Sequence, residues 1–387
     1  MPPSWSGIAT YSDLLLDGLA EDWELTVMVG DDETLPSHRS AKRFVHHSSE
    51  RWLFEVDPPD RMLCALGNSF YHRHVPGLLL RHGGVVLAHD VRMNALQCFR
   101  AQEAPQRDFL SSAIDRRYGW RLGSEFRAFE SRGGVASHFG AVRARMDEAN
   151  LYLLGEAVRG ADQVAVHSNA AKRLAELDLE ETIPVVKVPF GHSDRDGTPT
   201  SAPNYTVSTF GFVAHEKAPV ALLQAFANVH QACPQSELRY VGHVDPVFEQ
   251  ELIATADALG LAEVVTFTGR LDGAAYRLEL SRASVAVQLR AASNGEASAA
   301  IADTMSQGIP TIVTGIGAQC EFPDNAVVKV NPGNNSAEVS AAILSVLELP
   351  HMSAGLRDGA ILHSSGSSFG HAAKALTTLL VDCPRLR

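Results

Sequence analysis

The chain has 387 residues, of which 45% are hydrophobic and 20% are charged, which predicts a soluble globular protein of two domains or three. A formal net charge of −12 argues against a nucleic-acid-binding surface, and the five scattered cysteines form no CxxC pair and no metal-ligand spacing. We expect no membrane span, no signal peptide, reduced thiols and a cytoplasmic protein.

The first half alternates short apolar runs with helical stretches. A Pro-rich turn at residues 2–12 leads into a predicted helix at 11–19, and a charged, mostly helical stretch covers 92–160. Strands are predicted at 24–29, 62–66, 85–88, 163–166 and 185–189. Strands that alternate with helices indicate a mostly parallel sheet that is covered on both faces.

One strand is missing from this alternation. A doubly wound domain begins with a strand at the centre of its sheet. Here six residues precede Gly7, and Pro2 and Pro3 lack the N–H that a central strand donates. Either the protein begins upstream of Met1 or the first domain lacks this strand, and we favour the first explanation.

Residues 191–204 form the predicted linker, because they are rich in Gly, Ser, Pro, Thr and Asp and have no apolar period. A second alternation follows. Its strands are predicted at 207–213, 237–241, 264–268, 284–289, 309–313 and 326–330. Its helices are predicted at 217–232, 246–259, 273–283, 298–307, 335–348 and 369–381. The expected divisions are a first domain at 1–190, a linker at 191–204, a second domain at 205–365, and a C-terminal helix at 366–387 that can cross back.

Residues 284–314 carry the clearest strand–helix–strand pattern, with Gly308 as the residue that ends the helix. The polar loop 290–296 follows the first strand, where ligands bind in open α/β sheets. Glu296 and Asp303 are seven residues apart, about two helical turns, so we expect both carboxylates on one helix face. The alternative is that both acids simply complement the helix dipole.

The motifs, taken in order, resemble those of the retaining nucleotide-sugar glycosyltransferases of family 4, which have the GT-B architecture of two doubly wound Rossmann-like α/β domains with a cleft between them. The resemblance covers nearly the whole chain. The matching segments are PPSWSGIATY at 2–11, LGNS at 66–69, His89-Asp90, the Gly-x5-Lys loop from Gly211 to Lys217, VTFTGR at 265–270, and Gly308-Ile309-Pro310.

The resemblance implies roles for particular residues. Lys217 would hold the donor diphosphate, Asp303 the ribose hydroxyls, and Glu296 the donor sugar. Gly7 would let backbone amides approach the phosphates, and His89 would lie against the sugar. The donor-binding set is then Gly7, Phe212, Lys217, Arg290, Glu296, Ala297, Ser298, Ala299 and Asp303, with His89, Lys217 and Glu296 as catalytic residues and no metal ligand.

Three features depart from the family pattern, of which one is that the second acid, Asp303, is an aspartate where the family has a glutamate. Phe212 stands where the family often has arginine, so we assign the second diphosphate cation to Arg290. Six residues separate Glu296 from Asp303 where the family has seven, which puts Gly295 in the place of the first acid. Plainer roles stay open: a solvated lysine for Lys217, a core histidine for His89, a turn for Gly7, and surface arginines for Arg290 and Arg270.

The resemblance implies transfer of a sugar from a nucleotide-diphospho-sugar to a small-molecule, glycan or lipid-linked acceptor, with retention and without a cofactor. The acceptor is expected to contact the first domain, within residues 92–147. A nucleotide-sugar isomerase of the 2-epimerase kind and a non-catalytic nucleotide-sugar-binding subunit are the alternatives. A homodimer is left open.

Overall fold

A computed structural model of the protein describes residues 7–104, 106, 108–180, 182–193, 205–384 and 386. Contacts divide the chain into two units. The first unit is Met1–Pro189, Asn294–Ala297 and Phe369–Arg387, and the second is Phe190–Ser293 and Ser298–Ser368. Residues 2–6 of the predicted glycine loop and residues 194–204 of the predicted linker lie outside the described residues.

The second unit is built on a six-stranded parallel sheet. Its strands are β7 (Thr206–Phe210), β8 (Glu237–Val241), β9 (Val265–Phe267), β10 (Val285–Gln288), β11 (Thr311–Thr314) and β12 (Val327–Val330). Their order across the sheet is β12-β11-β10-β7-β8-β9. This is the doubly wound order, in which the first strand lies at the centre and the order reverses between β7 and β10.

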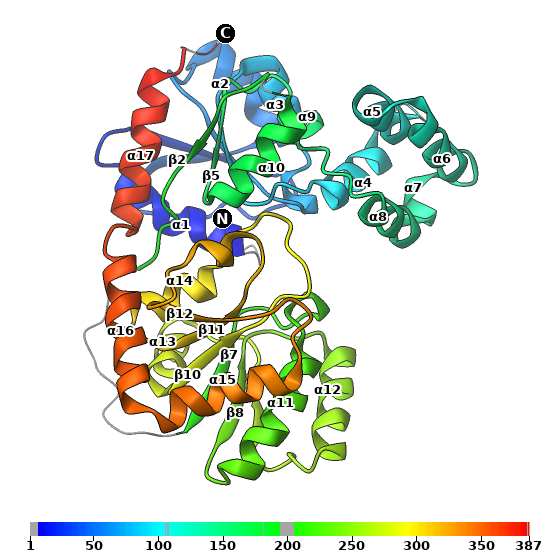
Figure 1. Ribbon diagram of the computed structural model, residues 1–387. Helices are drawn as coiled ribbons and strands as arrows, with labels where there is room; N and C mark the ends of the chain where they lie inside the picture. The colour runs from blue at the N-terminus through cyan, green and yellow to red at the C-terminus, as the bar shows by residue number, and fades with distance from the viewer. Residues whose placement is uncertain are drawn as a thin grey trace. The chain divides into compact units, whose positions relative to one another are not determined.

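Helices pack around this sheet, as Figure 1 shows. They are α11 (Pro219–Ala232), α12 (Pro246–Ala258), α13 (Gly273–Arg282), α14 (Ala299–Ser306), α15 (Ser336–Glu348) and α16 (Pro350–Ser364). Proline opens α11, α12 and α16, where its missing N–H costs no hydrogen bond. Every residue of β10 and β11 is buried, as expected for central parallel strands.

The sequence did not predict α16.

No helix in the described part of the chain reaches by itself the length and apolarity that a membrane span requires. Only α15 and α16 taken together reach that length and composition, and they are bent by 96° at their junction.

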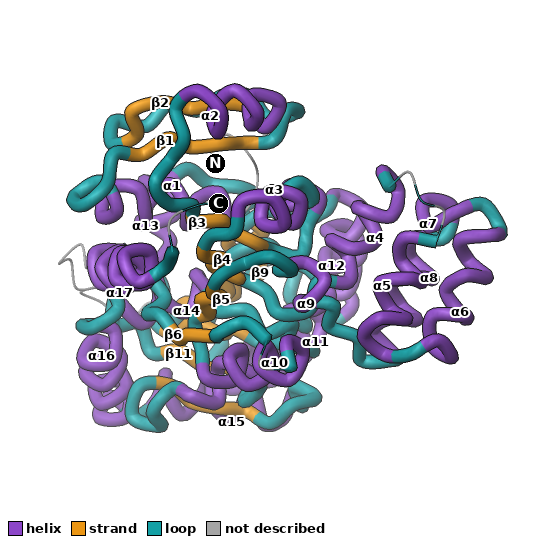
Figure 2. Tube along the Cα trace, turned by 90° about the horizontal axis from the view of Figure 1, so that it is seen from above, coloured by secondary structure: helices purple, strands orange, loops and turns teal. Residues whose placement is uncertain are grey.

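The first unit has its strands in two separate parallel sheets, shown in Figure 2. One sheet pairs β1 (Leu25–Val29) with β2 (Ala41–His46). The other has the order β3-β4-β5-β6, with bounds Leu63–Leu66, Val85–Ala88, Gln163–Val166 and Val185–Lys187. The sequence predicted all of these strands except β2, which lies in the polar stretch before residue 60 together with an unpredicted helix, α2 (Glu50–Val56).

Besides α2, the helices that this unit has outside its insert include α1 (Gly7–Leu19), α3 (Val75–His82), α10 (Asn169–Leu179) and α17 (Phe369–Asp382). Gly18 of α1 faces Ala373 of α17, where an added Cβ would lie 2.7 Å from the alanine side chain. The indole nitrogen of Trp23 also donates a hydrogen bond of 3.1 Å to Thr377 Oγ1. The C-terminal helix is therefore fixed to the first helix of the same unit.

A helical insert follows β4. It runs through α4 (Asn94–Glu103), α5 (Phe109–Tyr118), α6 (Trp120–Ser131), α7 (Gly134–Ser137) and α8 (Phe139–Glu148), before α9 (Leu154–Ala157). Figures 1 and 2 show α5 to α8 as a group beside α4. The insert has its own apolar core, with Ile114, Phe126 and Met146 fully buried. Met93 N donates to Tyr152 O at 2.7 Å, so the chain enters and leaves the insert at adjacent points.

Candidate functional site

In the sheet of the second unit, the order of the strands reverses between β7 and β10, and the candidate site lies at this point. Arg290 lies just beyond the carboxyl end of β10, and 8% of its surface is exposed. Its backbone N–H donates to Thr314 Oγ1 at 2.9 Å, and its carbonyl accepts from Asn334 Nδ2 at 2.9 Å. Its guanidinium Nη2 lies 3.4 Å from Ser298 Oγ. The arginine is therefore held by backbone bonds and directed to the start of α14.

Lys217 reaches the same point from the loop after β7. It ends a short 3₁₀ turn, η3 (His215–Lys217), whose Glu216 carbonyl accepts from Ala291 N at 2.8 Å. Gly211 has a φ of +91°, and a Cβ there would lie 2.8 Å from Lys217 Nζ and 3.9 Å from Ala300 Cβ. The ammonium therefore lies over Gly211 beside the first turn of α14.

The first turn of α14 adds backbone amides to the two cationic side chains. Ser298 is the N-cap, and its Oγ accepts from Ile301 N at 3.4 Å. The amides that precede Ile301 in the turn have no carbonyl partner within a helix, and a helix start favours an anion. Lys217, Arg290 and the start of α14 thus bring two cationic side chains and a helix N-terminus to one point, and an anion such as a phosphate is the ligand that suits such chemistry.

Asp303 lies farther along α14. Its Oδ2 accepts a hydrogen bond of 3.1 Å from the Tyr276 hydroxyl. Burial raises the pKa of Asp303 to about 6, and the Tyr276 bond and His192 oppose that rise only in part. The carboxylate therefore carries a charge above pH 6, and in that state it can accept two hydroxyl donors.

We expect Asp303→Asn to remove a pH-dependent part of the stability. The folded-state pKa of about 6 exceeds the ordinary value of 3.8, so this group stabilises the fold below about pH 4 and loses that contribution as pH rises through 6. Relative to the variant, the wild-type free energy of unfolding should fall by up to about 3 kcal/mol across that window. Urea unfolding at several pH values measures this, with Asp358→Asn on α16 as the control. Parallel pH profiles of wild type and Asp303→Asn would contradict the assignment.

In the first unit, His89 follows the carboxyl end of β4, and its N–H donates to Leu66 O at 2.8 Å. Its ring packs edge-on against Tyr11 at 5.0 Å and lies 5.3 Å from the ring of His167. Burial, with His167 and His72 nearby, lowers the pKa of His89 well below its usual value. The imidazole is therefore neutral, and its Nε2 has no hydrogen-bond partner within the described residues.

Glu296 lies in the first unit and precedes α14. The helix begins at Ala299, and the Glu296 Oε2 accepts from Asn294 N at 2.6 Å within a loop. The expectation that Glu296 and Asp303 share a helix face is therefore wrong, because the N-cap of α14 is Ser298, which is extended at φ −112° and ψ 111°, so Glu296 precedes the helix. The segment Asn294–Ala297 is part of the first unit, whereas Asp303 is part of the second.

Asp90 is a buried acid that the sequence analysis included only as part of the His89-Asp90 motif. Its Oδ2 accepts from Asn68 N at 2.8 Å. Burial raises the pKa of Asp90 to about 6, and the nearby Glu296 adds to the rise. Asp90 and Tyr276 carry no local sequence signal, because their roles depend on residues 206 and 27 positions away.

The remaining predicted residues are placed as follows. Gly7 begins α1, and an added Cβ there would meet no atom within 4 Å. Phe212 is 54% exposed, with its ring 5.5 Å from that of His243. Ala297 lies in the first unit, and Ala299 opens α14 in the second. Across the described residues, the acids, histidines and cysteines form no group of three that could hold a metal ion.

The fold and this arrangement can be compared with known proteins. Residues 204–349 match the family model described as Glycosyl transferases group 1. No curated protein sequence matches the chain at a significant level. Sucrose-phosphate synthase from Thermosynechococcus elongatus is 15% identical with a TM-score of 0.68, over 97% of this chain and 92% of that one.

Two further structures span almost the full length of both chains. WaaG, a glycosyltransferase involved in lipopolysaccharide biosynthesis, is 10% identical with a TM-score of 0.65, over 98% of this chain and 97% of that one. HepE from Anabaena, in complex with UDP and glucose, is 16% identical with a TM-score of 0.58, over 98% and 97%. The chain therefore has the GT-B fold of these glycosyltransferases, and the part that matches the Glycosyl transferases group 1 model lies in its second unit.

Proposed function

We propose that the protein transfers a sugar from a nucleotide-diphospho-sugar to an acceptor, with the donor held by the second unit. The observation that carries the proposal is the cluster of Lys217, Arg290 and the start of α14 at the reversal of the sheet. Open α/β sheets bind ligands at this point, and the group 1 match covers the same unit.

The chemistry of this cluster suits a leaving diphosphate. Two cationic side chains and the first-turn amides of α14 would face the negative charge that develops as the glycosidic bond breaks. Arg290 is held by its backbone bonds before any ligand arrives, so little reorganisation is needed. We infer that these groups neutralise the charge of the leaving diphosphate, as a metal ion does in other enzymes, and that the reaction needs no metal.

Asp303 is proposed to bind the ribose. Its carboxylate would accept both ribose hydroxyls, while Tyr276 fixes its orientation. Because only the charged form accepts from both, nucleotide affinity should increase as pH rises through about 6. This direction is opposite to the effect of the same group on stability.

The first unit is proposed to supply the groups that meet the sugar and the acceptor. The neutral ring of His89 can donate to or accept from a hydroxyl, and Glu296 lies near Asp90, the next residue in the chain. The family resemblance implies retention. Because no carboxylate in the described chain stands out as a nucleophile, we propose that the acceptor attacks on the face that the diphosphate leaves. The leaving phosphate would then take the acceptor's proton.

The first test is thermal stabilisation by a panel of nucleoside diphosphates and their sugars. A ligand that binds only the folded state, at a concentration 100 times its Kd, adds about 2.7 kcal/mol to the free energy of unfolding. The melting temperature rises as a result. We expect one base to be favoured. Release of free nucleoside diphosphate that depends on an added acceptor would then identify a transferase. An altered nucleotide sugar without any acceptor would identify an isomerase instead, and binding with no turnover across an acceptor panel would leave a binding subunit.

Two further expectations belong to the proposal. The five cysteines are all unpaired, which supports a reducing compartment and hence the cytoplasm. A homodimer remains a prediction that light scattering of the purified protein can check. The acceptor is proposed to be a small molecule, a glycan or a lipid-linked sugar.

A further inference from the structure

Side-chain hydrogen bonds join the carboxyl ends of β10, β11 and β12. Arg290 lies two residues beyond the end of β10, Thr314 is the last residue of β11, and Asn334 lies four residues beyond the end of β12. These strands are neighbours in the sheet, in the order β12-β11-β10. Asn334, Thr314 and Arg290 therefore follow the order of the strands along the carboxyl edge of the sheet.

These three residues form a closed ring of hydrogen bonds. The Arg290 N–H donates to Thr314 Oγ1 at 2.9 Å, and the Thr314 hydroxyl donates to Asn334 Oδ1 at 2.5 Å. Asn334 Nδ2 then donates to the Arg290 carbonyl oxygen at 2.9 Å, which closes the ring. All three bonds run in the same direction around the ring, and bonds in such a chain polarise and strengthen one another.

The ring is buried. Thr314 is 0% exposed, Asn334 is 5% exposed and Arg290 is 8% exposed. A buried donor or acceptor that loses its partner costs more free energy than an ordinary hydrogen bond contributes. Removal of the polar group of Thr314 or Asn334 should therefore affect the other members of the ring as well.

Asn334 suits its position in two ways. Its φ is +52°, in the left-handed region that asparagine tolerates better than most residues. Its amide has an oxygen that accepts and a nitrogen that donates, and the ring uses both. The reverse orientation of the amide would place its oxygen 2.9 Å from the Arg290 carbonyl oxygen, so one orientation fits and the other does not.

The bonds fix the backbone on both sides of the Arg290 Cα. The peptide before it is held through the Arg290 N–H. The peptide after it is held through the Arg290 carbonyl and through Ala291 N, which donates to Glu216 O at 2.8 Å. Because each peptide is planar, φ and ψ of Arg290 are the only soft angles between them. The direction in which the Arg290 side chain leaves the backbone is therefore fixed.

The same bonds reach the loop of the second cation. Glu216 precedes Lys217 in η3, so the bond from Ala291 connects the loop after β10 to the loop after β7. At the other end of the arginine side chain, Nη2 lies 3.4 Å from Ser298 Oγ at the start of α14. The arginine is thus held both at its backbone and at its guanidinium.

We propose that Thr314 and Asn334 are positioning residues of the donor site, which hold Arg290 in place for the diphosphate group of the donor. This inference rests on the proposed function, because that function assigns Arg290 to the diphosphate. Thr314 and Asn334 act through the arginine and not by contact with the ligand. A cationic group that is held in advance stabilises the diphosphate without a further cost of ordering.

The first test measures binding by calorimetric titration. Thr314→Val keeps the size of the side chain and removes the hydroxyl, and Asn334→Gly suits the left-handed backbone and removes the amide. The ligands are inorganic pyrophosphate and the nucleoside diphosphate that the stabilisation panel selects. Both variants should raise the Kd of both ligands about tenfold, which corresponds to the loss of about 1.4 kcal/mol. The Kd of the nucleoside without phosphate should stay within about twofold of the wild-type value.

Two further threonine variants make this result specific. Thr314→Ser keeps the hydroxyl and should restore the Kd to within about twofold of the wild-type value. Thr311→Val is the matched control, because Thr311 lies on the same strand, is also 0% exposed, and bonds to Thr304 and to the carbonyl of Ile309. This control removes a buried hydroxyl too, but it should leave the Kd unchanged.

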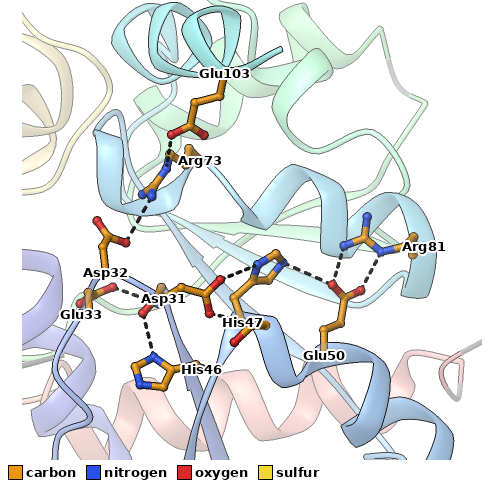
Figure 3. Close-up of polar contacts among 11 residues, drawn as sticks. Asp31, Asp32, Glu33, His46, His47, Glu50, Arg73, Arg81 and Glu103 are labelled. Carbon is orange, nitrogen blue, oxygen red and sulfur yellow. Dashed lines mark hydrogen bonds and ion pairs between the residues drawn. The ribbon is translucent and has the colours of Figure 1, made fainter. Parts of the chain in front are cut away.

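A control in the first unit separates positioning from a general loss of stability. Glu50 of α2 accepts hydrogen bonds from Arg81 of α3, at 2.6 Å from Nε and 2.7 Å from Nη2, as Figure 3 shows. The Glu50 side chain is 14% exposed, so Glu50→Gln should weaken this pair and lower the melting temperature. The Kd of pyrophosphate should not change in this variant.

The second test needs no ligand. Hydrogen exchange followed by mass spectrometry measures how often the amides of Arg290 and Ala291 open. Both amides should exchange at least about tenfold faster in Thr314→Val and Asn334→Gly than in the wild type. In Thr311→Val they should exchange at the wild-type rate. Unchanged exchange in Thr314→Val and Asn334→Gly would show that the ring does not hold the arginine, and would overturn the inference.

The third test combines the changes. In an Arg290→Ala protein, Thr314→Val should raise the Kd no further, because the group that Thr314 positions is absent. Additive effects, or a normal pyrophosphate Kd in Thr314→Val and Asn334→Gly, would overturn this inference and leave the proposed function standing. A wild type that binds neither pyrophosphate nor any nucleoside diphosphate would overturn both.

Discussion

Lys217→Ala should abolish most of the donor affinity while leaving the fold intact. The ammonium lies over Gly211 beside the start of α14, where a diphosphate would receive a charge-assisted hydrogen bond. Loss of such a bond costs about 1.5–3 kcal/mol, which is about a tenfold to 150-fold rise in Kd. If the diphosphate is also the leaving group, kcat should fall about 10²-fold to 10³-fold as well. Calorimetric titration with the preferred nucleoside diphosphate and steady-state kinetics measure both quantities.

Two controls make the Lys217 result specific. Lys374→Ala, on the exposed side of α17, removes the same charge elsewhere and should change neither Kd nor kcat. Lys217→Arg keeps the charge and should recover part of the affinity, because a guanidinium also binds phosphate. Free energies of unfolding should stay within about 1 kcal/mol of the wild type. An unchanged nucleotide Kd in Lys217→Ala would remove this residue from the site.

Gly242→Ala should damage the fold and the donor site together. Gly242 follows β8 with a φ of +146°, and a Cβ there would overlap the carbonyl oxygen of Gly211. A backbone atom cannot rotate away as a side chain can, so the ends of β7 and β8 must separate. Overpacking and the positive φ together should cost about 3 kcal/mol. Because Lys217 lies over Gly211, nucleotide binding should weaken too, even in the fraction that folds.

The matched control for Gly242 is another glycine to alanine change. Gly355 lies exposed within α16, has no atom within 4 Å of an added Cβ, and should gain stability from the better helix propensity of alanine. Denaturant unfolding and nucleotide titration of both variants give the comparison. A Gly242→Ala protein as stable as the wild type, with normal nucleotide affinity, would show that the two strand ends move apart freely.

The sequence predicted most of the strands because their signal is local. β4, β5 and β8 match their predicted ranges, since each is a short segment of mostly apolar residues between turn or loop residues. β2 was missed because its residues, Ala41–His46, include lysine, arginine and histidine and are only partly buried. It is a strand because β1 offers a parallel partner, which is a tertiary cause.

The same distinction between local signals and tertiary causes applies to the residues of the candidate site. Arg290 and Ser298 were predicted from the polar loop and the helix start, and Lys217 from the family resemblance. The structure brings all three to one point of the sheet. Whether they bind a donor remains a prediction. The position of Glu296 was misjudged because the helix begins only after the N-cap Ser298, and the spacing of two acids does not report where a helix begins. Tyr276 could not be found from the sequence, because a hydroxyl–carboxylate contact across two helices leaves no pattern.

The helical insert has a consequence for how this protein can change. Its two ends meet at the bond between Met93 and Tyr152, and its apolar core is its own. Such a segment closes a loop whose ends are already adjacent, so its length adds little entropic cost to folding. Inserts of different size and surface could be exchanged at the Met93–Tyr152 position while the sheets stay unchanged. The fold thus carries an exchangeable module, through which new specificities could arise by recombination and not by gradual change of the core.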